Sequence, residues 1–179
     1  MDERRVIAHS PPIRFISQHW GLHVEGYLDF RNRPREYVEA RIEEARAAAK
    51  LAEEMLKKEL YQNAANKAFM ALKALLSALV VLRLDLLTRD AKRREWYLKV
   101  GYAAPTTGLI RIAKDLEALG VAGVEPVVKT ALMLHRFAYN GFDPNFVDYS
   151  DLEEVASDVK QVLEYVEKIL RQLETSKGN

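Results

Sequence analysis

A long stretch, residues 35–87, contains no glycine and no proline. In its first half, apolar residues recur at alternating intervals of four and three. This spacing places them on one side of an α-helix. A chain dominated by this period folds as helices that pack through their apolar faces, so the sequence predicts an all-α protein whose first helix runs from Pro34 to Leu60. The residues of the stripe are Val38, Ile42, Ala45, Ala49, Ala52 and Leu56.

The second half of the stretch, Asn63 to Leu87, is apolar on nearly every side, which predicts a helix surrounded by its neighbours. A single rod over residues 35–87 would be roughly 80 Å long, too long for a compact domain of this size. We therefore expect a tight turn at Leu60–Asn63, with Asn63 as the N-cap of the second helix. Its apolar spacing is kept by Ala65, Ala68, Leu72, Leu75, Leu79, Leu82 and Leu86.

Three more helices are predicted beyond a connection at residues 88–105. The first starts at Thr106 or Thr107 and ends before Gly120, and the second lies between Pro126 and Gly141. The last begins at a capping box of Ser150 and Glu153. Inward-facing positions in these helices are Leu109, Ile112, Ala113, Leu116, Val127, Val128, Ala131, Leu134, Ala138, Leu152, Val155, Val159, Val162, Val166, Ile169 and Leu173.

The predicted fold is an antiparallel four- to five-helix bundle over residues 34–174. Residues 1–33 differ, because their aromatic residues follow no helical period. We expect them to form an irregular arm, with short strands an option at residues 25–30, packed on the bundle or on a partner subunit. Residues 175–179 form a polar, frayed tail.

Composition excludes several classes of chemistry. The 179 residues include no cysteine, which rules out disulfides, thiol nucleophiles and cysteine-ligated metals. The net charge of +1 provides no overall attraction for polyanions. No glycine-rich phosphate loop or nucleophile elbow is present. His19 and His23 have helical spacing, but Gly21 between them opposes a helix, so we expect no metal site and no cofactor. The longest apolar run is too short to cross a membrane, and we expect a cytoplasmic protein.

Two groups of residues are candidates for binding. His135 and Tyr139 share one face of the fourth predicted helix, and Arg136 and Asn140 share the neighbouring face. Such groups at the end of an apolar helix can bind an anion or form an acid–base pair, although ordinary edge-of-core residues and a helix cap account for the same pattern. In the connection, basic and aromatic residues interleave as in single-strand nucleic-acid sites, although a solvated loop closed by Trp96 is the simpler interpretation. The second group is Arg89, Lys92, Arg93, Arg94 and Trp96.

The order of these features resembles the archaeal PaREP-type proteins, a helical family grouped with the HEPN superfamily of nucleotide-binding domains. The similarity covers roughly residues 33–173. The resemblance implies a helical bundle that pairs into a homodimer. The superfamily includes metal-independent ribonucleases and nucleotide-binding partners of nucleotidyltransferases. The segments that carry the resemblance are RPREYVEARIEEA at residues 33–45, AANKAFMALKAL at residues 64–75, Glu95–Tyr97, Leu134–His135 and Tyr139–Phe142.

The ribonucleases of the superfamily carry an arginine followed, after four to six residues, by a histidine. Here Arg136 is the arginine in that place, but residues 141–143 are Gly, Phe and Asp. We therefore expect a non-catalytic homodimer that binds a nucleotide, RNA or a partner protein near His135, Arg136, Tyr139 and Asn140. One alternative is a divergent ribonuclease in which Arg136 stabilises a charged phosphate and His135 replaces the missing imidazole. Another is a purely structural interaction module.

Overall fold

The computed structural model describes residues 29–176, and every regular element in this range is helical. The prediction of an all-α protein is confirmed. The strands considered at residues 25–30 fall almost wholly outside the described range, as does most of the arm. In chain order the elements are α1 (Pro34–Lys57), α2 (Tyr61–Leu82), α3 (Leu84–Leu87), α4 (Ala91–Lys99), η1 (Gly101–Ala103), η2 (Thr106–Gly108), α5 (Leu109–Ala118), α6 (Val124–Asn140) and α7 (Leu152–Thr175).

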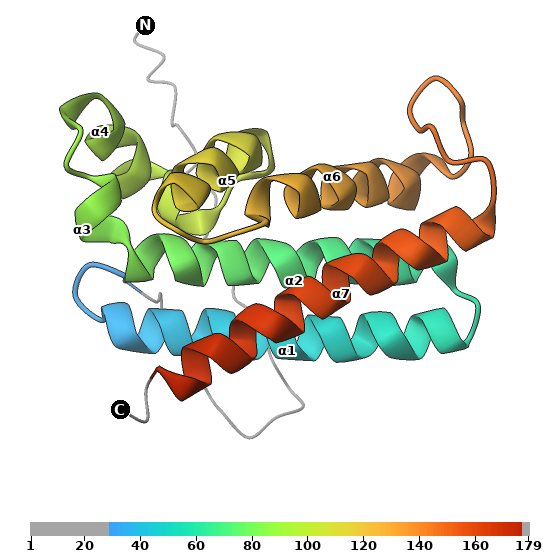
Figure 1. The fold of residues 1–179 in the computed structure, drawn as a ribbon, viewed down its shortest axis with the longest axis horizontal. Helices are drawn as coiled ribbons and strands as arrows, with labels where there is room; N and C mark the ends of the chain where they lie inside the picture. Colours follow the sequence, from blue (N-terminus) through green and yellow to red (C-terminus); the bar gives the residue numbers. More distant parts are fainter. Residues whose placement is uncertain (1–28, 177–179) are drawn as a thin grey trace, which may run out of the picture.

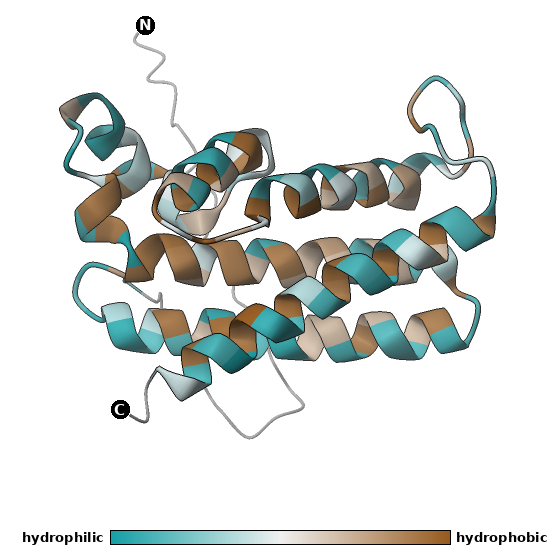
Figure 2. Cartoon of the chain, viewed as in Figure 1, coloured by the Kyte–Doolittle hydropathy of each residue, from teal (hydrophilic) through white to brown (hydrophobic). Residues whose placement is uncertain are grey.

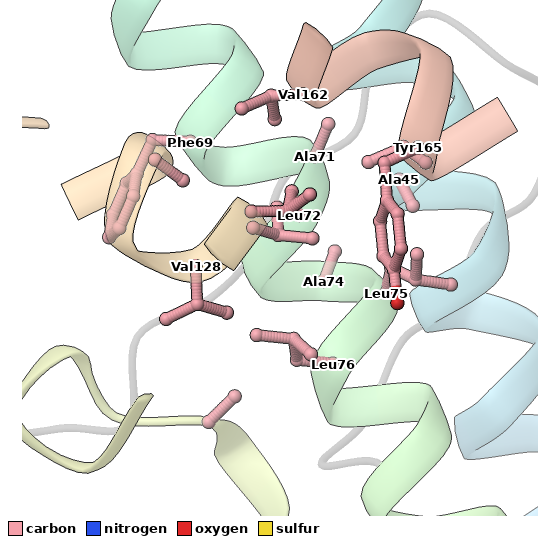
Figure 3. Close-up of a cluster of buried hydrophobic side chains, with 14 of the residues drawn as sticks. Ala45, Phe69, Ala71, Leu72, Ala74, Leu75, Leu76, Val128, Val162 and Tyr165 are labelled. Atoms are coloured by element: carbon pink, nitrogen blue, oxygen red, sulfur yellow. The ribbon is translucent and has the colours of Figure 1, made fainter. Parts of the chain in front are cut away.

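Helix α2 forms the centre of the fold. Helices α1 and α2 lie side by side and run in opposite directions, α6 lies on another side of α2, and α7 crosses the pair diagonally (Figure 1). Leu75 and Val162 are both completely buried, as the helical periods predict. In Figure 3, leucines on several sides of α2 point toward α1, α6 and α7. The outward faces of α1 and α7 are hydrophilic (Figure 2), so the charged positions of these helices serve mainly to keep the surface solvated.

The turn between α1 and α2 falls earlier than predicted. It occupies residues 58–60, and Glu59 adopts the left-handed conformation that usually marks glycine, with φ of 58°. Asn63 lies inside α2 and is not its N-cap. The second predicted helix also does not continue to Leu87. The backbone breaks at Arg83, and Leu82 and Leu86, expected in the core, are 43% and 37% exposed.

Residues 88–105 were expected to form a connection but contain α4. Asp90 caps this helix, because its side chain accepts a hydrogen bond from the Lys92 N–H. The α5 segment also differs at its start. Thr106 and Thr107 belong to the short 3₁₀ turn η2, and Gly108 precedes α5 without a side-chain cap. All four predicted inward residues of α5 are buried, and Gly120 ends the segment with φ of 89°.

Helix α7 starts with a capping box one residue later than predicted. The Asp151 carboxylate accepts a hydrogen bond from the Glu154 N–H at 2.9 Å, and the Glu154 carboxylate accepts one from the Ser150 N–H at 2.7 Å. Ser150 and Glu153 therefore do not form the predicted pair. Glycine ends α6 where predicted, with Gly141 at φ of 59°. These two termini set the position of the loop that joins α6 to α7.

Helix α2 is the one described helix that is long and apolar enough to cross a membrane. Most of its apolar window, 72%, is buried inside the fold. A membrane-spanning helix instead exposes an apolar surface to lipid. This burial is consistent with the core helix of a soluble protein.

Candidate functional site

The two predicted residues on one face of α6 contact each other, and His135 packs against α2. The imidazole of His135 stacks on the ring of Phe69, with ring centroids 4.2 Å apart, and Tyr139 meets the same imidazole edge-on at 5.1 Å. His135 is partly buried, whereas Tyr139 is 72% exposed. Phe69 in the core, the partly buried His135 and the exposed Tyr139 thus form a series of three rings in contact.

The surroundings of the His135 ring lower its pKa and so favour the neutral imidazole. Burial is the main cause that lowers its pKa below the ordinary 6.5, and the positive charge of Lys73 on α2 lowers it further. The Nδ1 atom of His135 is buried and has no hydrogen-bond partner among the described residues. An unsatisfied buried nitrogen costs about 1–3 kcal/mol, which makes this position one to examine for a role beyond core packing.

Lys73 is the second polar group beside these three rings. Its side chain is partly buried, and within residues 29–176 it forms no ion pair and no hydrogen bond. The charge of Lys73 reaches the His135 ring, because it contributes to the lowered pKa of that histidine. A partly buried ammonium group without a carboxylate partner favours the approach of an anion.

Lys73 belongs to a stripe on α2 that sequence reasoning missed. Gln62, Asn66, Phe69 and Lys73 follow one another at intervals of four, three and four, so they lie on one side of the helix. A methyl group added at Gly141 would lie 3.6 Å from the Gln62 amide nitrogen, which places the start of α2 beside the end of α6. We call the set formed by this stripe, His135 and Tyr139 the α2–α6 seam. Polar residues on an otherwise apolar helix were the available signal.

Arg136 and Asn140 do not join the seam. Asn140 donates a hydrogen bond from its side-chain amide to the Arg136 carbonyl oxygen at 2.8 Å and so caps the end of α6. The Arg136 side chain is exposed and forms no ion pair in the described part of the chain. The predicted four-residue cluster is thus divided into a pair against α2 and a pair toward solvent.

The basic segment is partly used for internal contacts. Arg93 pairs with the buried carboxylate of Asp115, whose other oxygen accepts a hydrogen bond from the Tyr97 hydroxyl at 2.7 Å. Burial and the Asp115 hydrogen bond raise the pKa of Tyr97 far above its ordinary value. Arg94 donates from its Nε atom to the Thr88 carbonyl oxygen at 3.0 Å. These contacts fix α4 against α5.

Trp96 is also held in place. The Arg111 guanidinium lies 4.8 Å from the centre of its ring, and a methyl group added at Gly101 or Gly108 would lie 2.6 Å from ring atoms. The tryptophan therefore packs between two backbone segments that have no room for a side chain. Of the five residues predicted in this segment, only Arg89 and Lys92 have exposed side chains with no ion pair or hydrogen bond among the described residues.

No group of three or more potential metal-ligating side chains is found in residues 29–176. His19 and His23 lie outside this range. Within it, His135 is the single histidine, and its neighbours are rings and an ammonium group, which are not metal ligands.

The fold and the seam define an all-helical protein with aromatic rings and an unpaired ammonium group where α6 packs on its central helix. The sequence matches the archaeal PaREP1/PaREP8 family over residues 40–163, and the chain belongs to this family. No curated protein and no solved structure matches the chain significantly. The family resemblance expected from the sequence is confirmed.

Proposed function

We propose that the protein is a non-catalytic binding module that holds a nucleotide, free or within single-stranded RNA, at the α2–α6 seam. The observation that carries the proposal is the Tyr139 ring, which is 72% exposed and contacts edge-on the His135 imidazole that stacks on Phe69. Exposed aromatic rings that stack on bases contribute about 1–3 kcal/mol per base. A supported ring loses little freedom when a base stacks on it.

The charges near the ring support the same ligand class. Lys73 lies beside His135 without a carboxylate partner, and exposed Arg136 follows His135 on α6. A nucleotide combines a flat base with an anionic phosphate, so a ring and a nearby unpaired cation match both parts. A purely structural module has no need of an unpaired ammonium group at a partly buried position.

The same geometry disfavours the ribonuclease alternative. A general acid–base histidine needs a proton-transfer partner and an orienting group. His135 instead contacts two rings, and its pKa is lowered by burial and by the nearby Lys73 cation. Arg136 lies on a different face of α6, because adjacent helical residues diverge by about 100°. The absence of a histidine after Arg136 at residues 141–143 also argues against a ribonuclease. We therefore propose that the protein binds its ligand without cleaving it.

The proposal includes the finer features expected from the resemblance. We propose that the helices form an antiparallel HEPN-like bundle that assembles as a homodimer in the cytoplasm. A nucleotidyltransferase-type protein remains a candidate partner of such a bundle. None of these features is needed for the seam itself, so the seam can be tested in the purified chain.

The test is the affinity of the full chain for a fluorescent oligouridylate in metal-free buffer, with uridine monophosphate as a competitor. We expect Tyr139→Ala to weaken binding about tenfold or more because it removes the stacking ring. Lys73→Met keeps the apolar stem and should weaken binding and reduce its salt dependence. Competition by the monophosphate identifies a free nucleotide as sufficient, whereas binding of the oligomer alone identifies RNA.

Lys168→Met, on the exposed face of α7, is the matched control and should bind as the unchanged protein does. Equal affinity in all three variants would contradict the seam as the binding site. Cleavage of the oligomer that disappears in Arg136→Ala would instead establish the ribonuclease.

A further inference from the structure

The two ends of the molecule carry opposite charge. Figure 1 places α3 and α4 at one end of the longest axis and the loop between α6 and α7 at the other. Residues 83–100, the basic end, contain six basic and three acidic residues, a net charge of +3. Residues 141–154, the acidic end, contain five acidic and no basic residues, a net charge of −5. Although the net charge of the whole chain is close to zero, its two ends therefore have opposite charge.

The charges at the basic end are available to a partner. Arg93 is already paired with Asp115. The Arg94 side chain donates a hydrogen bond to the Thr88 carbonyl oxygen. The other four cations are exposed and form neither an ion pair nor a side-chain hydrogen bond within the described residues: Arg83, Arg89, Lys92 and Lys99. Apolar side chains lie among them, with Leu82 43%, Leu86 37% and Val100 39% exposed.

The acidic end has the complementary composition. Phe142, Phe146 and Leu152 are 44%, 53% and 40% exposed, which is high for large apolar side chains. Asp148 and Glu153 are exposed beside them in the sequence and form no hydrogen bond or ion pair among the described residues. Exposed apolar groups surrounded by acidic residues fit a surface that is apolar and basic.

We infer that copies of this chain associate head to tail, with the basic end of one copy bound to the acidic end of the next. Charge complementarity selects this arrangement, because two like ends brought together would repel. The contact is heterologous, and it produces either a closed ring or an open filament according to the rotation between copies. This association is independent of the proposed ligand at the seam.

The test is sedimentation velocity of the full chain over a concentration series at low and high salt. We expect assembly to grow with concentration and the apparent affinity to fall about tenfold or more between 50 mM and 500 mM NaCl, because salt screens exposed charges. The double variant Arg89→Glu/Lys92→Glu and the double variant Asp148→Lys/Glu153→Lys should each, when alone, form nothing larger than the homodimer proposed above. An equimolar mixture of the two should assemble further, because the basic end left intact in the second variant is complementary to the acidic end left intact in the first.

The control is Lys160→Glu/Lys168→Glu, which changes the net charge as much as Arg89→Glu/Lys92→Glu but lies on the exposed face of α7. It should assemble as the unchanged chain does. An assembly no larger than the proposed homodimer at every concentration would overturn the inference, as would larger assemblies that neither end variant affects. If the unchanged chain shows no head-to-tail association and Arg89→Glu/Lys92→Glu abolishes its binding of oligouridylate, the basic end is an RNA site instead.

Discussion

At the scale of single residues, the seam depends on groups whose surroundings the sequence does not reveal. Helical spacing predicts that His135 and Tyr139 share a face, and their rings meet at 5.1 Å. Helical spacing within α6 gives no information about Phe69 and Lys73, because both are far away in the chain. They lie near His135 because α2 packs against α6. Local pattern therefore predicts only His135 and Tyr139 of the seam, and tertiary contact supplies the rest.

The lowered pKa of His135 makes stability depend on pH. Burial and Lys73 keep the folded-state pKa below the ordinary 6.5, so the unfolded chain binds more protons between these two pKa values. Stability is therefore complete above about pH 6.5 and falls as the pH falls toward the folded-state pKa. We expect the decrease in Tm between pH 7.5 and pH 6 to be smaller in His135→Gln than in the unchanged protein. Equal decreases in both proteins would contradict the lowered pKa.

At the scale of elements, the long apolar periods predict the long helices, whereas the short polar segments give no signal for the turns or for α4. The apolar positions predicted in α1, α5 and α7 are mostly buried, but Leu152, predicted to face inward at the start of α7, is 40% exposed. The turn at Glu59 and the break at Arg83 contain no glycine or proline, so no local signal marks them. Helix α4 was missed because its nine residues are highly charged and it is held by the Arg93–Asp115–Tyr97 contacts. Such contacts depend on the packing of α5.

The packing of Trp96 predicts the effect of a small substitution at Gly108. Gly108→Ala places a methyl group 2.6 Å from the indole ring, and overpacking of this kind costs about 1–3 kcal/mol. We expect a loss of that size in the free energy of unfolding measured with urea. In a Trp96→Leu background the same substitution should cost less than about 1 kcal/mol, because the obstructing ring is gone. An equal cost in both backgrounds would show that the clash does not determine the effect.

At the scale of the whole molecule, one buried helix organises the surface features. Because α2 contacts α1, α6 and α7, its polar stripe meets the end of α6. The connection through α3 and α4 places the basic residues at the end opposite the α6–α7 loop (Figure 1). The sequence pattern identifies the core of such a molecule, but the direction of each helix decides which surface residues meet.

The most direct test of the seam is a histidine ¹H–¹³C NMR spectrum recorded while oligouridylate is added, with the His135 signal assigned from its loss in His135→Gln. Our account predicts that the His135 ring signals shift and saturate with the affinity measured by fluorescence, because a base stacked on Tyr139 alters the ring current at the adjacent imidazole. Saturable RNA binding that leaves the His135 signals unmoved would contradict it.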